Sequence, residues 1–469
     1  MKKIFIIGGG IAGMFCAYLL AKKKCGYEIT IIEKNSFLGG AFSSYKTPEK
    51  YIFDIGIHIL YSTSIKEVDD IFFDVLPEDE WNILIGNKKD VAGVFFNQSL
   101  QVYSHYPDLT RFPVADLSTY ISDFYLNLAS PYPHKFISAK DMFIAKFGNE
   151  ISRNVIGPIL ENLWSKPLDS MDPSVIKINS LDRVILHNKN LMGDLIKAPN
   201  IASRLAYPDQ LNLPPVRKSQ QFALYPKKFG MKNFSEAFTT KLLQMGVNIK
   251  FDSFVESMTI NDGKVVSIDI NFSGNKISKK TDSLIWCGGL NQLAKKLDIP
   301  EQINKIPESK EVIFLNYLFD FEPNMPDIYY FYCYDIGFGS FRVTNYSNFC
   351  EDASSMGLYP ITIEFWPSKL HHTNSNDISN DFLEIGVKEL IQFGVIPPES
   401  KPVSKYMHDM RLKFPIPSVM NSASNQRISD AIKELAIHNI HAVGMSSKND
   451  VFFGNEILEQ VHSLTQSKF

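Results

Sequence analysis

The sequence predicts an α/β fold: a Rossmann-like dinucleotide-binding domain with a parallel sheet, a helical insert, and an antiparallel-sheet substrate domain. Two observations lead to this prediction. The chain opens with the apolar run Ile4 to Ile7, which ends in a glycine-rich turn and is followed by a helical pattern and a second apolar run. Short apolar runs without alternation are typical of buried parallel strands. Farther along, helical periodicity dominates residues 115–206 and strand patterns dominate residues 312–365.

The first glycine-rich turn has the spacing of a dinucleotide site, with glycines at positions 8, 10 and 13. Gly8 is expected to form the tight turn, Gly10 to let the backbone approach a pyrophosphate, and Gly13 to bring helix and strand together. The helix that follows presents free N–H groups, including those of Ile11 and Ala12, and its positive dipole end to the phosphates.

An acidic residue completes this unit. Glu33 ends the second apolar run, twenty positions after Gly13, where a carboxylate suits the ribose hydroxyls. Its neighbour Lys34 is included in the expected cofactor site. A glycine-rich turn of another α/β protein is the alternative, and so is a signal peptide. Three glycines within the apolar segment, and its direct continuation into a strand, argue against cleavage.

The elements after this unit follow the chain in order. Helical periodicity predicts helices at residues 117–129, 139–147, 149–164 and 173–185, and the proline-rich residues 199–219 are expected to form a surface connector. An Asp-Gly turn predicts a hairpin of residues 254–260 and 265–270. Strands are expected at 314–319, 329–334 and 359–365, a helix at 378–393, and a final helix from about Asn455.

These elements divide the chain into five predicted segments. Residues 1–110, 219–300 and 405–469 are assigned to the dinucleotide-binding domain. Residues 111–218 are assigned to the helical insert, and residues 301–404 to the substrate-side sheet.

Composition excludes several other classes of function. With 48 basic and 51 acidic residues the net charge is −3, which favours neither nucleic acid nor a membrane surface. No apolar stretch is expected to insert stably in a membrane. The five cysteines are scattered without a Cys-x-x-Cys pair, which fits a reducing, cytoplasmic location. His371 and His372 are adjacent and lack a third ligand at suitable spacing, so no metal site is expected.

A second glycine pair identifies the dinucleotide. Gly39-Gly40-Ala41-Phe42 follows the acidic strand, and the segment Asp54-x-Gly56-x-His58 comes after it. This pattern resembles the flavoprotein superfamily of monoamine oxidases, protoporphyrinogen oxidases, carotene desaturases and UDP-galactopyranose mutases, and the resemblance implies FAD. The family usually carries Arg where this chain has Ala41. The further FAD contacts that the resemblance implies are Gly39, Gly40, Ala41, Phe42, Gly56, Ile57, His58, Val255, Gly444 and Asn455.

Within the superfamily the chain is most similar to the nucleotide-sugar mutases. Their Asp-x-Gly-x-His segment implies that His58 lies against the reactive face of the flavin; the alternative is a histidine satisfied in the core. Arg183 matches the place where a mutase arginine reaches the substrate. Arg342 lies in a strand similar to the one whose arginine holds the diphosphate, although a strand arginine is commonly a solvated surface residue.

The function expected from this resemblance is pyranose–furanose isomerisation of a nucleotide sugar by reduced FAD. His58, Arg183 and Arg342 are the expected catalytic residues. The alternative is an FAD oxidoreductase of the amine oxidase or protoporphyrinogen oxidase type, and a flavin-binding protein without catalysis is a third class. No second strand–glycine–helix unit for NAD(P)H is found, so a reductant is expected to bind elsewhere or come from a partner. The sugar, the base and the oligomeric state are left open.

Overall fold

The computed structural model describes residues 1–23, 26–133, 135–219, 221–369, 378–445, 447 and 451–469. These residues form two compact units. Unit 1 contains residues 1–83, 223–307 and 422–469, and unit 2 contains residues 84–222 and 308–421. His371 and His372, the pair considered for a metal site, lie outside the described residues.

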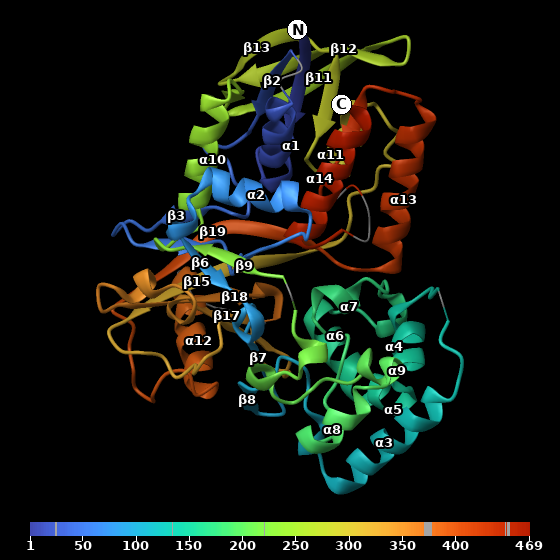
Figure 1. The fold of residues 1–469 in the computed structure, drawn as a ribbon, viewed down its shortest axis with the longest axis vertical. Helices are drawn as coiled ribbons and strands as arrows, with labels where there is room; N and C mark the ends of the chain where they lie inside the picture. Colours follow the sequence, from blue (N-terminus) through green and yellow to red (C-terminus); the bar gives the residue numbers. More distant parts are fainter. Residues whose placement is uncertain (24–25, 134, 220, 370–377, 446, 448–450) are drawn as a thin grey trace. The chain divides into compact units, whose positions relative to one another are not determined.

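A five-stranded parallel sheet organises unit 1 (Figure 1). Its order is β10 (Asn248–Lys250), β2 (Tyr27–Ile32), β1 (Lys2–Ile7), β14 (Ser283–Trp286) and β20 (Ile440–Ala442). Ile7 lies between Ile32 and Trp286 in register, so the residues that follow these three strands share one edge of the sheet. The chain leaves β1 toward β2 on one side and returns as β14 on the other, which makes this edge a topological switch point.

Helices cover the parallel sheet of unit 1. The helices are α1 (Ile11–Lys22), α2 (Lys66–Val75), α10 (Lys232–Gln244), α11 (Leu290–Lys296), α13 (Val419–Glu434) and α14 (Gly454–Lys468). Helix α1 is buried along its first ten residues and contacts both α10 and α14, beside which it runs in Figure 1. A helix that is apolar all round belongs in a core. Aromatic rings of Phe15, Phe72, Phe234 and Phe238 meet beside it.

Antiparallel strands complete unit 1. The predicted hairpin is present, and it continues into a third strand, in the order β11 (Ser253–Asn261), β12 (Lys264–Phe272) and β13 (Asn275–Lys280). Its inner face packs against β1 and β14 through Val255, Ile268 and Trp286. Shorter pairings join β3 (Ser44–Lys46) to β4 (Ile52–Asp54), and β5 (Leu60–Tyr61) and β6 (Trp81–Leu84) to β9 (Ala223–Pro226).

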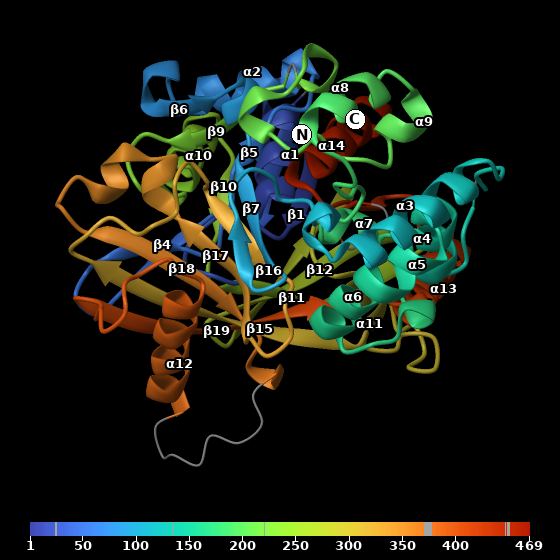
Figure 2. The ribbon, with the colours of Figure 1, turned by 90° about the horizontal axis from the view of Figure 1, so that it is seen from below.

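A seven-stranded sheet organises unit 2. Its order is β19 (Ser404–Pro415), β15 (Ser309–Phe319), β18 (Tyr359–Phe365), β17 (Ser340–Asn345), β16 (Tyr330–Cys333), β7 (Ala92–Phe96) and β8 (Ser99–Gln101). Neighbouring strands are antiparallel, as expected, except that β16 and β7 are parallel. Helix α12 (Ile378–Gln392) contacts β15 and β19, and Figure 2 shows it on this sheet.

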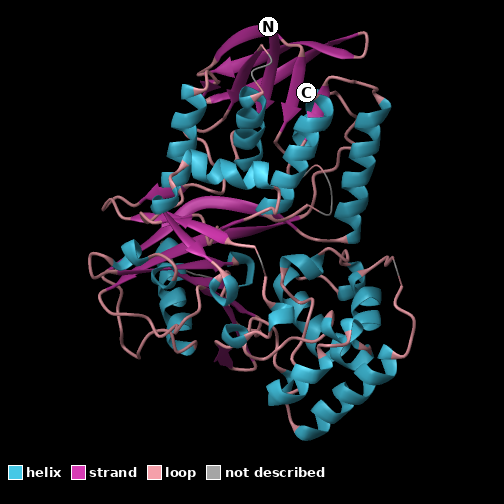
Figure 3. Cartoon of the chain, viewed as in Figure 1, coloured by secondary structure: helices cyan, strands magenta, loops and turns pink. Residues whose placement is uncertain are grey.

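Apart from α12, the helices of unit 2 gather in one group, which is cyan and free of strands in Figure 3. They are α3 (Val114–Leu128), α4 (Ala139–Phe147), α5 (Asn149–Ile151), a π-helical turn (Ser152–Ile156), α6 (Gly157–Trp164), α7 (Val175–Ile178), α8 (Lys189–Leu195) and α9 (Pro199–Ala202). The predicted helix at 173–185 is wrong beyond its first turn, because Ser180 adopts the left-handed φ of +50° and ends the helical path.

Short 3₁₀ turns connect these elements. They are Glu78–Glu80, Gly86–Lys88, Leu109–Arg111, Leu168–Ser170, Gln210–Asn212, Pro215–Arg217, Tyr346–Asn348, Glu351–Ser354 and Pro367–Lys369. The five-segment division of the chain stays a prediction. Residues 405–415 are assigned to the dinucleotide-binding domain by the sequence pattern. Strand β19, which contains them, lies in the sheet of unit 2.

Candidate functional site

The glycine turn after β1 has the local geometry of a phosphate-binding loop. Gly8 has a φ of +105° and donates its N–H to the carbonyl of Ile32 at 2.9 Å. A Cβ at Gly13 would lie 2.0 Å from the carbonyl oxygen of Gly8, so helix and strand are closer there than any side chain permits. A Cβ at Gly10 would meet no described protein atom within 4 Å, so this side of the loop is accessible to a ligand.

The second glycine pair lies directly beside the first. The N–H of Gly39 donates to the carbonyl of Gly9 at 2.8 Å, and Gly39 forms a bridge with Gly10. Gly39 and Gly40 have φ values of +116° and +58°, a conformation that glycine adopts without strain. Ala41, which replaces the arginine common in the resembled family, is exposed.

Glu33 is built into the loop through its carboxylate. It is 7% exposed and accepts hydrogen bonds from the N–H groups of Gly9 at 2.6 Å and Asn35 at 2.8 Å. A carboxylate has about four acceptor sites, so these bonds leave capacity for ribose hydroxyls. The neighbouring Lys34 is exposed. Val255 contributes its buried side chain to the core behind this edge of the sheet.

The other predicted FAD residues of unit 1 gather near the start of α14. The rings of Phe42 and His58 lie 5.1 Å apart between centroids. A Cβ at Gly454 would lie 3.3 Å from the ring of Phe42, which places that ring beside the first turn of α14, where Asn455 also lies. Gly444, with a φ of +111°, donates its N–H to Gln460 of the same helix at 2.8 Å. Ile57 is buried and Gly56 has a φ of +69°.

These features fit FAD. The open side of Gly10 and the adjacent Gly39–Gly40 backbone suit a pyrophosphate. Helix α1 has no acidic residue in its first turn, so none of the side chains of that turn competes with a phosphate for its free N–H groups and positive dipole. The loop around Phe42, His58 and the N-terminus of α14 suits the other end of an extended dinucleotide.

Asp54 holds this region together, a role that its sequence motif did not reveal. It is fully buried, and one carboxylate oxygen accepts from the Ser44 hydroxyl at 2.5 Å and the Met231 N–H at 2.9 Å. The other oxygen accepts from the Tyr225 hydroxyl at 2.6 Å. Burial raises the pKa of Asp54 to about 6, although these three hydrogen bonds oppose that rise. The available signal was an acidic residue within an apolar stretch, two positions before Gly56.

In unit 2, Arg342 on β17 is paired with an acid on the neighbouring strand. Its Nε and one terminal nitrogen donate to the two oxygens of Glu364 at 2.6 and 2.9 Å. Its guanidinium also lies 5.7 and 5.8 Å from the ring centroids of Tyr332 and Tyr330. Burial opposes the charged form, but Glu364, Tyr332 and Tyr330 together hold the pKa of Arg342 above its usual value.

Arg183 lies in an extended segment rather than on a helix. The next residue, Val184, forms an isolated bridge with Leu205, and Ile185 donates to the carbonyl of Pro107 at 2.9 Å. This double attachment brings Arg183 to Tyr106, whose hydroxyl accepts from its Nη1 at 3.1 Å. Arg183 and Arg342 both belong to unit 2.

Other cations surround Arg183. Lys146 and Arg204 are almost completely buried, and Arg217 is half-buried and has a buried Nε. Burial lowers the pKa of Lys146 to about 8, with Arg183 and Arg204 adding to the effect and Asp182 opposing it. Arg183 likewise acts on Arg217, lowering its pKa in addition to burial. We call Lys146, Arg183, Arg204 and Arg217 the basic cluster. Sequence reasoning missed three of its members because they lie far apart along the chain.

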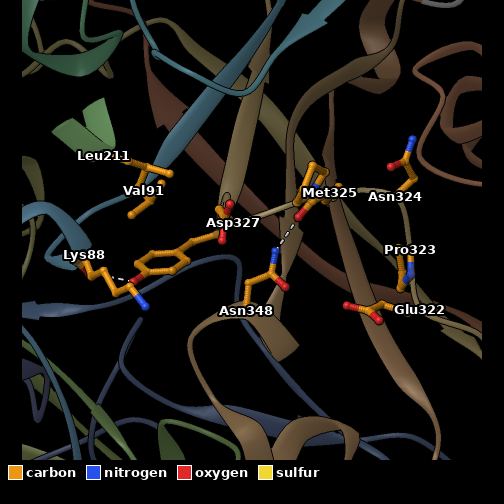
Figure 4. A pocket seen from close by; sticks show the side chains of 11 residues that line it. Lys88, Val91, Leu211, Glu322, Pro323, Asn324, Met325, Asp327 and Asn348 are labelled. Atoms are coloured by element: carbon orange, nitrogen blue, oxygen red, sulfur yellow. Dashed lines mark hydrogen bonds between the residues drawn. The ribbon is translucent and has the colours of Figure 1, made fainter. Parts of the chain in front are cut away.

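A separate pocket of about 550 Å³ lies elsewhere in unit 2. Figure 4 shows its lining, with Lys88, Glu322 and Asp327 of both charge signs and Asn348 directed at the carbonyl of Met325. None of the predicted site residues lines it. Among the described helices none has the length and apolar character needed to cross a membrane.

Comparisons with known proteins agree with this geometry. Residues 6–74 match a family model described as an NAD(P)-binding Rossmann-like domain. The 1-hydroxycarotenoid 3,4-desaturase of Flavobacterium sp. (strain P99-3) is 26% identical over 280 residues, which are 57% of this chain and 53% of the desaturase. The chain thus spans about half the length of that curated relative.

Solved structures match over a larger part of the chain. The structure of a reduced UDP-galactopyranose mutase is similar with a TM-score of 0.75 and 17% identity, covering 99% of this chain and 93% of the mutase. A putative protoporphyrinogen oxidase from Exiguobacterium sp. 255-15 is similar with a TM-score of 0.69 and 14% identity, covering 99% and 98%. These findings confirm the predicted α/β fold and the predicted resemblance to the flavoprotein superfamily. FAD, the predicted cofactor, is the cofactor of that superfamily.

Proposed function

We propose that this chain, an enzyme with the fold of the FAD-dependent amine oxidase superfamily, acts on a nucleotide sugar and exchanges its pyranose and furanose forms. The observation that carries the proposal is the basic cluster of unit 2. Arg183 and Arg204 act there on Lys146, Arg183 also acts on Arg217, and Asp182 is the carboxylate that acts on Lys146 and Arg217. Grouped cations in a partly buried site repel one another, and a dianionic substrate group would relieve that repulsion.

The remaining parts of the proposal follow from the residues of unit 1. The loops at Gly8–Gly13 and Gly39–Gly40 would hold the FAD pyrophosphate through backbone N–H groups. His58 and Phe42 would lie at the isoalloxazine end. Reduced FAD would supply the nucleophile for a ring-size change, and a reductant from outside the chain would keep it reduced. Arg183 would bind the diphosphate, and Arg342 would contribute less because Glu364 already offsets its charge.

The similarity to the mutase structure supports this choice at the level of the fold, because it extends over 99% of the chain. The test uses FAD-loaded protein under anaerobic conditions, reduced with dithionite, and UDP-galactose or dTDP-fucose as substrate. We expect isomerisation by the reduced protein and none by the oxidised protein. A reduced, FAD-loaded protein that isomerises neither donor nor related nucleotide sugars would contradict the proposal.

A second candidate is an FAD oxidoreductase, and the Arg342–Glu364 pair favours it. That pair removes one of the two expected substrate cations, and the aromatic rings around it suit an apolar substrate. The similarity to a carotenoid desaturase points the same way. In this case oxidised protein should lose its flavin colour when mixed with substrate, with no added reductant. Flavin bleaching by an amine or polyene would therefore favour this candidate over the mutase.

A further inference from the structure

Three buried nitrogen atoms in and beside the basic cluster have no hydrogen-bond partner within the described part of the chain. They are Nδ1 of His105, Nε of Arg183 and Nε of Arg217. The nearest acid to Arg183 Nε is Asp182, whose oxygen lies 3.5 Å away without hydrogen-bond geometry. A buried polar group without a partner costs about 1–3 kcal/mol, so several in one place call for a ligand.

Each side chain that carries one of these atoms interacts with Tyr106, by direct contact for His105 and Arg183 and electrostatically for Arg217. The ring of His105 lies 4.0 Å from the ring of Tyr106 between centroids, and Arg183 donates to the Tyr106 hydroxyl. Arg217 acts electrostatically on Tyr106 and is itself acted on by Arg183. Burial raises the pKa of Tyr106 and lowers that of His105, so both are neutral near pH 7.

Arg217 is held in place by a part of the chain that was expected to be a surface connector. It ends a 3₁₀ turn, and one of its terminal nitrogens donates to the carbonyls of Ala202 and Leu205, at 2.9 Å for the latter. These bonds fix the guanidinium by its far end, while its Nε stays without a partner among the described residues. A planar guanidinium that is held in place and has an unused N–H is well suited to bind an oxyanion.

We propose that His105 and Arg217 join Arg183 in a binding site for one oxyanion group of the substrate. The group accepts hydrogen bonds from the two arginine Nε–H groups and from Nδ1–H of neutral His105. This proposal deepens the proposed function and rests on it for the identity of the ligand, which is then one phosphate of the nucleoside diphosphate. A substrate carboxylate has the same acceptor chemistry and is the other source of such a group.

The site is tested by binding of inorganic pyrophosphate, which requires no turnover. Calorimetric titration of the FAD-loaded protein should give weaker binding for Arg217→Gln and for His105→Phe, the latter retaining a ring next to Tyr106. Loss of a hydrogen bond to a charged group should weaken binding about ten- to a hundredfold. Lys218→Gln is the matched control, because Lys218 is adjacent in sequence and carries the same charge outside the cluster. Arg217→Lys should recover part of the loss.

A second measurement needs no variant, which matters if a substituted protein fails to fold. Phenylglyoxal modification of the parent should be slowed at Arg217 by pyrophosphate, whereas the exposed Arg153 should react equally with and without it. Pyrophosphate binding that is unchanged in both variants, or no protection of Arg217 by either pyrophosphate or succinate, would overturn the site. If succinate protects Arg217 and pyrophosphate does not, the oxyanion is a carboxylate.

The outcomes separate this site from the proposed function. Protection of Arg217 by pyrophosphate, in a protein that isomerises no nucleotide sugar, keeps the site and removes the mutase. Isomerisation with normal pyrophosphate affinity in Arg217→Gln and His105→Phe keeps the mutase and removes the site.

Discussion

Replacing Asp54 by Asn should change the pH dependence of stability of unit 1. The folded state holds the pKa of Asp54 at about 6 against 3.8 for the free side chain, so the folded protein binds this proton more tightly. Stability from this group is therefore greatest below pH 3.8 and is lost as the pH rises toward 6. A difference of about two units corresponds to about 3 kcal/mol, of which roughly 2 kcal/mol falls between pH 4 and 6.5.

The Asp54→Asn protein lacks this titration, so its stability should not share that fall. Its amide oxygen can still accept from Ser44 and Met231, whereas the amide nitrogen faces the Tyr225 hydroxyl. Native-state hydrogen exchange of the α10 amides measures the opening free energy of unit 1 in both proteins. Comparison at each pH cancels the intrinsic exchange rate.

We expect the stability advantage of the parent over Asp54→Asn to shrink by about 2 kcal/mol from pH 4 to 6.5, about a thirtyfold change in the opening constant. Asp79→Asn, an exposed substitution in the same unit, should run parallel to the parent. Parallel curves for the parent and Asp54→Asn would refute the reasoning, because the buried carboxylate would then titrate alike in both states.

Substitutions at Gly10 and Gly13 distinguish loss of FAD binding from loss of stability, and a substitution at Arg342 tests its charge pair with Glu364. Gly10→Val should fold, because a Cβ at this position meets no described protein atom within 4 Å, yet it should lose FAD absorbance on gel filtration because the side chain occupies the space of the pyrophosphate. Gly13→Ala should lower the melting temperature through its clash with the Gly8 carbonyl. A stable Gly10→Val protein that retains FAD would contradict the first. Arg342→Ala should cost about 3–5 kcal/mol in urea unfolding because it leaves the Glu364 carboxylate buried without its partner. Adding Glu364→Gln should restore most of that stability, and no recovery would show that the charge pair is not the cause.

The dinucleotide unit was predictable because its information is local in sequence. Gly8, Gly10 and Gly13 are separated by two or three positions, and each acts through its own backbone or its missing side chain. The strand before them and the helix after them carry strong apolar patterns. Comparable local signals predicted the hairpin at residues 254–270 and helix α12.

The error at residues 173–185 has a different origin. Apolar residues there repeat at helical spacing, but their partners are other segments of the chain. Val184 bridges Leu205, and Ile185 bridges Asp108, so long-range extended pairing replaces the helix after Ser180. Periodicity indicates which residues are buried, and tertiary pairing decides the backbone conformation in which they are buried.

Charge partners were the least predictable part of the site. Whether Arg342 is available to a ligand depends on Glu364, and their contact depends on the register of β17 against β18, which places the two residues directly opposite each other. A shift of one residue would move Glu364 to the other face of the sheet. The same reasoning applies to Arg183, Arg217 and His105, because turns and bridges far apart in sequence bring them to Tyr106. An arginine in a motif thus predicts a positive charge, and its neighbours in the fold decide whether the guanidinium pairs with a carboxylate of the protein or can bind a substrate.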